Sequence, residues 1–363
     1  SENVGANYTM LFFRKYLIGF ILIFCGNAAG EVNCSQEDVT LKSQHEIDSF
    51  QLDYGICDVL LGSLTVRESV DNNIRNLVGL AGLEVIRGSL IIESNDELRS
   101  LEGLNSLSSI GSNLTISSNS KMSDLSSLYN LKWVSGIVLI DSNDALLSLA
   151  GIENLMQLAK LRVRNNDDLS ELKPLSSLFG LEELDFYNND ALLSLSAFPN
   201  LSNISGTIRI QGNDDLAEIE DLRKLSFIGG DLEVSNNLSL SSLSGLEGLQ
   251  SISGDLKVLG NTQLSDCGAL IFLLGWPDSE DSVGGTIAMS NNKSGCNSQA
   301  DSLSKSPYYG PTKYRYHSSI CRAEQTVNSI ALQSKETGLT NTNLSLSVDI
   351  ICPVPHPSFS ELY

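Results

Sequence analysis

The sequence has 363 residues, enough for one large domain or two of ordinary size. Hydrophobic residues make up 41% of the chain but aromatic residues only 6%, so an aliphatic interior is expected rather than a bulky aromatic core. The formal net charge of −21 is opposite in sign to what contact with a phosphate backbone requires, which argues against nucleic acid and bare anionic membranes as partners.

The N-terminal region has the pattern of a secretory signal. Met10 is followed by a basic pair, an apolar run over 16–25 and small residues up to Gly30. That run is shorter than the roughly 20 apolar residues that cross a bilayer, and the arrangement matches a cleaved signal peptide. We predict translated upstream sequence over 1–9, a signal peptide over 10–30 and an extracellular protein, secreted or held at the cell surface or cell wall. An uncleaved N-terminal anchor is the alternative.

Seven cysteines occur, and Cys25 lies within the predicted signal peptide. The six that remain are an even number in a predicted extracellular chain, which indicates disulfides. Several connectivities are open, and we predict that neighbours pair. The predicted pairs are Cys34–Cys57, Cys267–Cys296 and Cys321–Cys352. A zinc site is the alternative, but no CxxC spacing supports it, so neither a metal nor another cofactor is expected.

Residues 31–60 are expected to form an N-terminal cap, because the end of a stack of coils exposes strand edges. From residue 61 a phrase recurs in which apolar residues lie five and three places before an Asn. The anchors are 24, 24, 23, 23, 24, 24 and 24 residues apart. They are Asn95, Asn119, Asn143, Asn166, Asn189, Asn213, Asn237 and Asn261. Such a period is typical of a solenoid, in which each copy buries its apolar face on its neighbours.

Between the anchors, apolar residues recur at about every third place. One case is Leu98, Leu101, Leu104, Leu107 and Ile110. This spacing is neither the helical 3.6 nor a sustained strand period of 2, and the density of Ser, Gly and Asn disfavours helix. We therefore predict an all-β fold over 61–298. It is a right-handed parallel β-helix or leucine-rich-repeat-like solenoid, with coils of about 24 residues and disulfide-capped ends.

The recurring Asn is predicted to form a stacked ladder that satisfies backbone groups at the turn. Acids such as Asp96 and Asp144 often follow it and are expected to be solvated turn caps. Stacked acids can bind calcium, but the glycine-rich nonapeptide of calcium β-rolls is absent. Residues 299–363 lose the repeat and are rich in Ser, Tyr and Pro. We predict one disulfide there and no transmembrane helix or lipid-anchor signal.

Two strings in the repeats carry a family likeness, one from Gly230 to Asn237 and the other from Leu243 to Leu256. They resemble the receptor L domain, the leucine-rich, β-helical ligand-binding module of insulin and epidermal growth factor receptors, which also has counterparts in fungal cell-wall surface proteins. The likeness covers about residues 55–298, and the Cys267–Cys296 bracket resembles the closing bridge of such domains. It implies an extracellular recognition role. The chain departs from those receptors in having more coils and no furin-like module or kinase.

Side chains alternate along a strand, so the residues four and two before each anchor are expected to face outward. Arg and Tyr are enriched at binding hot spots, and we interpret the outward rows as a surface for a protein or acidic glycan ligand. The candidate ligand-contacting residues are Ile91, Leu139, Arg162, Arg164, Asp185, Tyr187 and Arg209. The alternative is that Arg162 and Arg209 pair with Asp185 across strands and stabilise the sheet.

Glycosylation sequons occur on several predicted surface loops. We predict modification at Asn33, Asn113, Asn200, Asn203 and Asn343. The sequons at Asn237 and Asn292 occupy ladder positions and are expected to be unmodified.

No GxSxG, HExxH or P-loop string is present, and all three histidines lie outside the repeats. We assign no catalytic residues and predict a binding protein rather than an enzyme. A structural cell-wall or matrix glycoprotein is the alternative. A β-helix polysaccharide lyase or hydrolase, with Asp185 beside Arg162 and Arg209 as its core, is the remote one.

Overall fold

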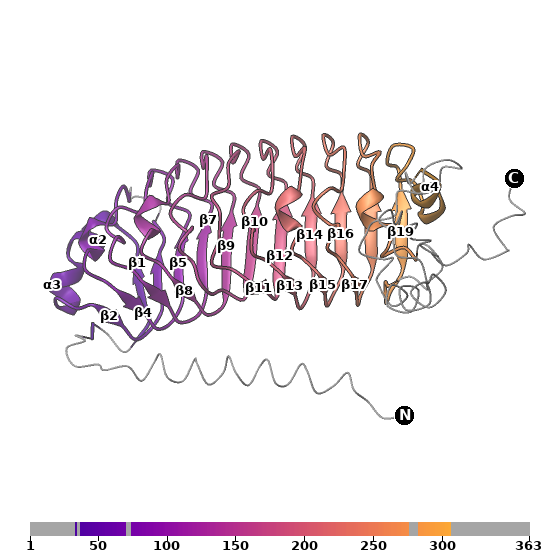
Figure 1. Cartoon of the computed structure of the whole chain (residues 1–363). Helices are drawn as coiled ribbons and strands as arrows, with labels where there is room; N and C mark the ends of the chain where they lie inside the picture. Colours follow the sequence, from indigo (N-terminus) through magenta and orange to yellow (C-terminus); the bar gives the residue numbers. More distant parts are fainter. Residues whose placement is uncertain (1–32, 35–36, 70–73, 276–281, 306–363) are drawn as a thin grey trace, which may run out of the picture. The chain divides into compact units, whose positions relative to one another are not determined.

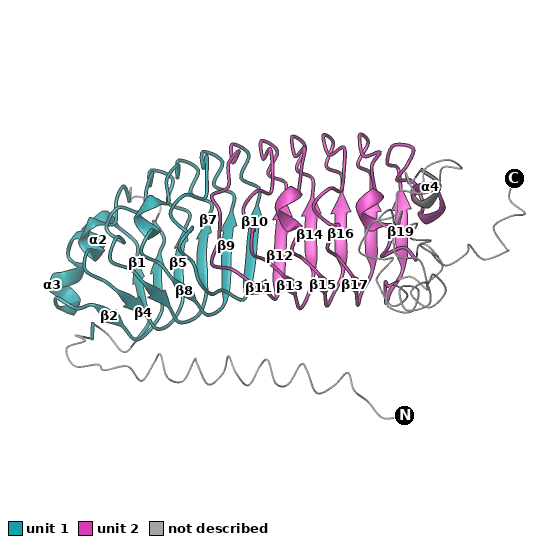
Figure 2. Cartoon of the chain, in the orientation of Figure 1, with its two compact units in different colours: residues 1–167 teal, residues 168–363 magenta. Residues whose placement is uncertain are grey.

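A computed structural model describes residues 33–34, 37–69, 74–275 and 282–305. The chain divides into two compact units between Asp167 and Asp168 (Figure 2). Each unit is a parallel β-solenoid, which confirms the predicted fold class. The predicted signal peptide, the Cys321–Cys352 pair and Asn343 lie outside the described residues.

The first unit contains a long and a short parallel sheet, to which successive coils contribute strands (Figure 1). The long sheet has the order β1 (Val39–Leu41), β3 (Leu64–Val66), β5 (Leu90–Glu93), β7 (Leu114–Ser117), β9 (Ile137–Asp141) and β10 (Lys160–Arg164). The short sheet has the order β2 (Val59–Leu60), β4 (Val85–Ile86), β6 (Ser109–Ile110) and β8 (Trp133–Val134). The 3₁₀ helices η1 (Val78–Leu80) and η2 (Ser126–Leu128) lie between a long and a short strand.

The second unit repeats this plan. Its long-sheet strands are β12 (Glu183–Tyr187), β14 (Ile208–Gln211), β16 (Leu232–Ser235), β18 (Leu256–Leu259) and β19 (Ile287–Ser290). Its short sheet has β11 (Gly180–Leu181), β13 (Asn203–Ile204), β15 (Phe227–Ile228) and β17 (Ser251–Ile252). Two 3₁₀ helices, η3 (Glu220–Leu222) and η4 (Gly268–Leu270), lie between strands, and α4 (Gln299–Lys305) follows β19.

The core of each unit is a stack of aliphatic side chains. On β9, Val138 and Ile140 are fully buried, whereas the residues between and beside them are partly exposed. The residues spaced three apart also point inward: Leu98, Leu101, Leu104, Leu107 and Ile110 are all fully buried. Burial of one Leu or Ile side chain contributes about 1.5–3 kcal/mol, so the repeated inward positions stabilise every coil against the next.

The recurring Asn forms a buried ladder at the turn after each long strand. All eight anchor side chains have 0% exposure. Asn119 shows the pattern: its backbone N–H and its Nδ2 both donate to Asn143 Oδ1, at 3.2 and 3.1 Å. The same Nδ2 donates to the carbonyl oxygen of Ile92 in the preceding coil, at 3.0 Å. The Asn119 side chain therefore satisfies backbone groups of its own coil and of the preceding one, and it also hydrogen-bonds the Asn side chain of the next coil.

The residue before each anchor adopts a left-handed backbone, as at Ser118 with φ 54°. Ser, Asn and Gly occupy this position in different coils. Gly212 has φ 68°, and a Cβ atom there would lie 2.3 Å from Asn188 Oδ1 of the preceding coil. Gly260 meets Asn236 Oδ1 at the same distance. At both of these positions, glycine leaves room for the Asn side chain of the preceding coil.

The N-terminal cap extends the long sheet, since β1 pairs in parallel with β3. The cap also contains α2 (Gln44–Asp48) and α3 (Phe50–Tyr54), which lie beside β1 at the end of the first unit (Figure 1). Ser43 caps α2 by accepting a hydrogen bond from the Glu46 N–H at 3.2 Å. Ile47 and Phe50 are buried beneath the helices. The predicted Cys34–Cys57 disulfide is present and joins the cap to the region just before β2.

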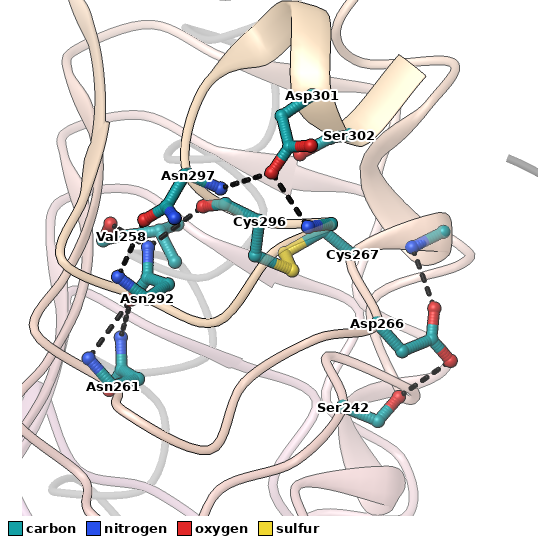
Figure 3. The surroundings of a disulfide bond; sticks show 12 residues. Ser242, Val258, Asn261, Asp266, Cys267, Asn292, Cys296, Asn297, Asp301 and Ser302 are labelled. Carbon is teal, nitrogen blue, oxygen red and sulfur yellow. Dashed lines mark hydrogen bonds between the residues drawn. A yellow bond between two sulfur atoms is a disulfide. The ribbon is translucent and has the colours of Figure 1, made fainter. Parts of the chain in front are cut away.

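The second unit ends in a closure that terminates the Asn ladder (Figure 3). Asn292 Nδ2 donates to the carbonyl oxygens of Val258 and Cys296, at 2.7 and 2.8 Å. The Asn292 N–H, which in an inner coil would reach the next ladder residue, donates to Asn297 Oδ1 at 2.8 Å. The predicted Cys267–Cys296 disulfide ties this loop to the start of η4.

Replacing a ladder residue tests whether these hydrogen bonds hold the coils together. We expect Asn143→Ala to lower the free energy of unfolding by about 3 kcal/mol or more, because several buried backbone groups and Asn119 lose their partner. The measurement is urea denaturation followed by circular dichroism. Asn130→Ala is the matched control, since Asn130 is exposed and its side chain makes one hydrogen bond to Asn105. Equal losses in the two variants would contradict the ladder's role.

A second substitution tests the turn before the anchor. Gly212→Ala should lower the free energy of unfolding by about 1–2 kcal/mol from the left-handed backbone alone, with a further loss from contact with Asn188 Oδ1. Ser118→Ala is the control, because that position already holds a Cβ atom at φ 54°. Denaturation midpoints that shift equally in both variants would show that Gly212 has no special role.

Candidate functional site

The long sheet of the first unit presents an uncharged outer row. Strand register aligns Thr40 with Thr65, then Ile91, Thr115, Leu139 and finally Arg162. Thr40 is exposed and the others are partly exposed. Neighbouring strands are about 4.8 Å apart, so these side chains lie at a fixed spacing, and from Thr65 onward hydroxyl and aliphatic residues alternate until the row reaches Arg162. We call the five uncharged residues, Thr40, Thr65, Ile91, Thr115 and Leu139, the first-unit row.

Charged residues flank the first-unit row on the same face. Glu93, Ser117, Asp141 and Arg164 are aligned by register on successive strands. Arg67 Nη1 lies 3.3 Å from Glu93 Oε1 at the start of this flank. The first unit therefore presents an apolar and hydroxyl stripe with mixed charges along one side, as in protein interfaces that have an apolar centre and a polar rim.

The equivalent row of the second unit is built from alternating charges. Asp185, Arg209, Glu233 and Lys257 are aligned in this order on neighbouring strands. Arg209 Nη1 lies 3.6 Å from Asp185 Oδ2, and Arg209 Nε lies 3.4 Å from Glu233 Oε2. The cross-strand pairing of Arg209 with Asp185, weighed above as an alternative, is therefore present. The charge of Arg209 is compensated within the sheet.

Asp185 differs from the sequence prediction. Its register places it on the outer face beside Arg209, but its side chain is only 1% exposed. A buried carboxylate needs compensating charge or hydrogen bonds, and Arg209 lies over it. A ligand on the sheet face cannot reach this side chain, so Asp185 is not a ligand contact and cannot act as the accessible core of a polysaccharide-cleaving site.

The remaining predicted site residues divide between the two units (Figure 2). Arg162 and Arg164 lie on β10 of the first unit, where they are in register with Leu139 and Asp141 of β9. Tyr187 lies on β12 of the second unit, where it is partly exposed and in register with Gln211.

A second ladder, which the sequence reasoning missed, precedes the long strands. Here the side chain of one coil accepts a hydrogen bond from the backbone N–H of the equivalent residue in the next. In the second unit, Asp231 Oδ1 accepts from Asp255 and Asp255 Oδ1 accepts from Thr286, both at 2.8 Å. In the first unit, Asn113 Oδ1 accepts from Ile137 at 2.9 Å. The sequence carries a signal for this ladder: a short polar residue follows Gly immediately before several of the long strands, as in Gly230-Asp231.

Asp255 is the most perturbed carboxylate of this second ladder. The Thr286 N–H, the Lys257 ammonium and the Thr286 hydroxyl all bind the ionised form and lower the pKa of Asp255 to about 2. Lys257 Nζ lies 2.9 Å from Asp255 Oδ2, and the same contact raises the pKa of Lys257. These shifts have a structural cause, because the hydrogen bonds to Thr286 hold β18 and β19 together.

The acids after the anchors lie at the turn surface. Glu97 pairs with Lys121 one coil later at 2.5 Å, and this hydrogen bond lowers the pKa of Glu97. Among the described residues, no three His, Cys, Asp or Glu side chains are grouped closely enough to hold a metal ion. Within the same part of the chain, no helix has the length and apolar character to cross a bilayer.

Part of the sequence of this solenoid matches a known family. Residues 84–178 match the family described as the receptor L domain. Over this segment the chain is similar to the receptor L domain. This match confirms the predicted family likeness, and the receptor L domain family is a non-enzymatic, ligand-binding one. The chain matches no curated protein.

The receptor L domain segment contains part of the candidate surface. It includes β4 through β10, and therefore Ile91, Thr115, Leu139, Arg162 and Arg164. The predicted residues of β12 and β14 lie beyond the matched segment. Of the first-unit row, Ile91, Thr115 and Leu139 lie within the matched segment, whereas Thr40 and Thr65 precede it.

Acid titration tests the hydrogen-bonded state of Asp255. Its pKa is depressed from 3.8 to about 2 in the folded protein, so its contribution to stability is present above pH 3.8 and disappears as pH falls through about 2. We expect Asp255→Asn to lose less stability than the wild type between pH 4.5 and pH 2 in urea denaturation. Asp221→Asn, on η3, is the control and should follow the wild type. Identical pH dependence in all three proteins would refute the assignment.

Proposed function

We propose that the protein is an extracellular recognition protein, secreted or held at the cell surface, which binds a protein or glycan ligand through the first-unit row. The observation that carries this proposal is the coincidence of a receptor L domain over 84–178 with a partly exposed, uncharged strip on its long sheet. The two disulfides support an extracellular location, because such bonds persist in oxidising compartments.

The rigidity of the face favours binding. Ile91 and Leu139 project from strands whose inner side chains are fully buried, so a ligand meets side chains that are already in place. Preorganisation of this kind raises affinity because less freedom is lost on association. The uncharged strip also carries a smaller desolvation cost than a row of ions would.

The charges favour a protein over a polyanionic glycan. Arg209 is paired with two carboxylates, Arg164 is aligned with Asp141, and the net charge of the chain is −21. An acidic polymer would therefore meet few uncompensated cations and a repulsive overall field. A partner with an apolar centre and mixed charges at its edge fits the first-unit row better.

A structural role in a cell wall or matrix is the second candidate. It is favoured by the continuous ladders, which satisfy the backbone at every turn within each unit. The two candidates differ in one measurable property, because only a recognition protein has a saturable ligand.

The test uses the full chain secreted from a eukaryotic host and screened against extracellular proteins and glycans from the native source. We expect a saturable partner whose affinity falls severalfold for the double variant Ile91→Thr with Leu139→Thr. Thr occupies the same row at 65 and 115, so the sheet should tolerate both changes. Glu at the same two positions should reduce affinity at least about tenfold, which corresponds to 1.4 kcal/mol.

Met156→Glu is the matched control, since Met156 is exposed in the same unit but lies off the first-unit row. Its affinity should equal that of the wild type, and the melting temperatures of all variants should show that they are folded. A ligand that binds the Thr and Glu double variants as tightly as the wild type would place the binding surface elsewhere. Absence of any saturable partner, with the protein insoluble in a wall or matrix, would favour the structural role.

A further inference from the structure

We propose that Asn203 carries an N-linked glycan whose first sugar packs against Phe227 on the short sheet of the second unit. This inference rests on the proposed extracellular location, because N-glycans are added on the secretory pathway. It concerns a different sheet from the first-unit row and does not depend on which ligand that row binds.

Two exposed aromatic side chains lie at this short sheet, Phe227 on β15 and Phe179 just before β11. Phe179 is 61% exposed and Phe227 is 40% exposed. Phe227 is the β15 residue in register with Asn203 of β13, and Asn203 is in turn in register with Gly180 of β11. Adjacent strands are about 4.8 Å apart, so Asn203 and Phe227 leave the same face of the sheet side by side. Phe179 lies one coil earlier, where its carbonyl oxygen accepts a hydrogen bond from the Ser202 N–H at 2.9 Å.

The Asn203 amide is placed to carry a sugar. Asn203 and Ser205, the first and last residues of the sequon, are both exposed, while Ile204 between them is buried. Asn203 Nδ2 donates one hydrogen bond, to Ser202 Oγ at 3.1 Å. Glycosylation replaces one of the two Nδ2 hydrogens and leaves the other, so this bond can persist. The absence of a side chain at Gly180 gives room for the amide, because a Cβ there would lie 2.9 Å from Asn203 Oδ1.

The neighbouring sequon at Asn200 is held differently. Its Nδ2 donates to the Ser176 carbonyl oxygen at 2.7 Å, and its Oδ1 accepts from Lys224 Nζ at 2.6 Å. Asn130 makes the equivalent corner bond to the carbonyl oxygen of Asn105 in the first unit. Asn200 is thus held at a corner by partners on both its Nδ2 and its Oδ1 and is only partly exposed, whereas Asn203 is exposed, so we assign the glycan of this loop to Asn203.

Two further sequons among the described residues of the second unit are inaccessible to a sugar. Asn237 and Asn292 are buried in the ladder, and their Nδ2 groups donate to carbonyl oxygens of earlier coils. A glycan on either would separate the coils, so folded protein cannot carry one there. Among the described residues of this unit, Asn203 is the sequon asparagine that is exposed and has room for a sugar.

The contact with Phe227 gives the glycan a physical role. The C–H face of a pyranose and the face of an aromatic ring are both apolar, and bringing them together removes apolar surface from water. The sugar would then cover part of the exposed aromatic surface and leave a hydrated, polar one. We expect the glycan to raise the melting temperature by about 2–4 °C, as about 1 kcal/mol of stabilisation does in a domain of this size.

The experiment uses the full chain secreted behind an established leader in a eukaryotic host, with glycopeptides mapped by mass spectrometry. We expect high occupancy at Asn203 and none at Asn200, Asn237 or Asn292. Ser205→Ala removes the sequon and leaves Asn203 in place, so it should lower the melting temperature by the stated amount. Ser205→Thr keeps the sequon and should match the wild type.

The contact itself is tested in a double-mutant cycle. In a Phe227→Ser background, which matches Ser251 in the same row, adding Ser205→Ala should no longer change the melting temperature. Leu193→Ser is the control, since Leu193 is exposed in the same unit but lies outside the short sheet. In that background Ser205→Ala should keep its full effect.

Two results would overturn the proposal. One is an unmodified Asn203 in secreted, folded protein. The other is an effect of Ser205→Ala that is equal with and without Phe227. Because the leader is supplied and no ligand is needed, neither result depends on ligand binding by the first-unit row, and a failed ligand screen would leave the glycan assignment untouched.

Discussion

The buried amide hydrogen bonds of the Asn ladder are the constraint on which the rest of the structure depends. A parallel solenoid turns its chain at the same place in every coil, and the turn leaves backbone N–H and C=O groups inside the stack, away from water. An Asn side chain can hydrogen-bond to both kinds of group, because it carries two donors and an acceptor in one plane. Asn119 uses them to reach the coils on either side of it. The left-handed residue before each anchor is the geometric consequence, since it aims the amide into the stack.

Once the turns are fixed, the outward residues of the long strands lie at regular positions, and their side chains can differ from one coil to the next. The two units use this freedom differently. The first-unit row holds threonine and aliphatic side chains up to Arg162, whereas the second unit alternates acid and base from Asp185 to Lys257. The alternating row compensates its own charges and stabilises its sheet. The uncharged row does neither, and this is the physical reason for assigning recognition to it.

The repeat period and the apolar spacing were enough to predict the solenoid and its inward residues, and pairing of neighbouring cysteines predicted the Cys34–Cys57 and Cys267–Cys296 disulfides. The period and the spacing succeeded because one backbone rule, repeated coil after coil, leaves the same signal many times. The site was harder to predict because it depends on single side chains that break the repetition. Asp185 follows the alternation rule for an outward residue, yet it is buried because Arg209 of the next coil lies over it. The inward and outward alternation of side chains along one strand does not predict whether a long side chain from the neighbouring strand will cover an outward residue.

The same limit explains the second ladder and the sequons. Asp231, Asp255 and Asn113 are short polar residues before strands, and their role becomes visible only when coils are stacked and each oxygen meets the next N–H. The tripeptide at Asn200 is as complete a sequon as the one at Asn203, but one amide ties a corner together and the other is exposed beside Phe227. In a repeat protein, therefore, the role of a motif depends on its position in the coil. Turn positions serve the stack, corner positions tie one coil to another, and the exposed faces of the sheets are left for ligands and modification.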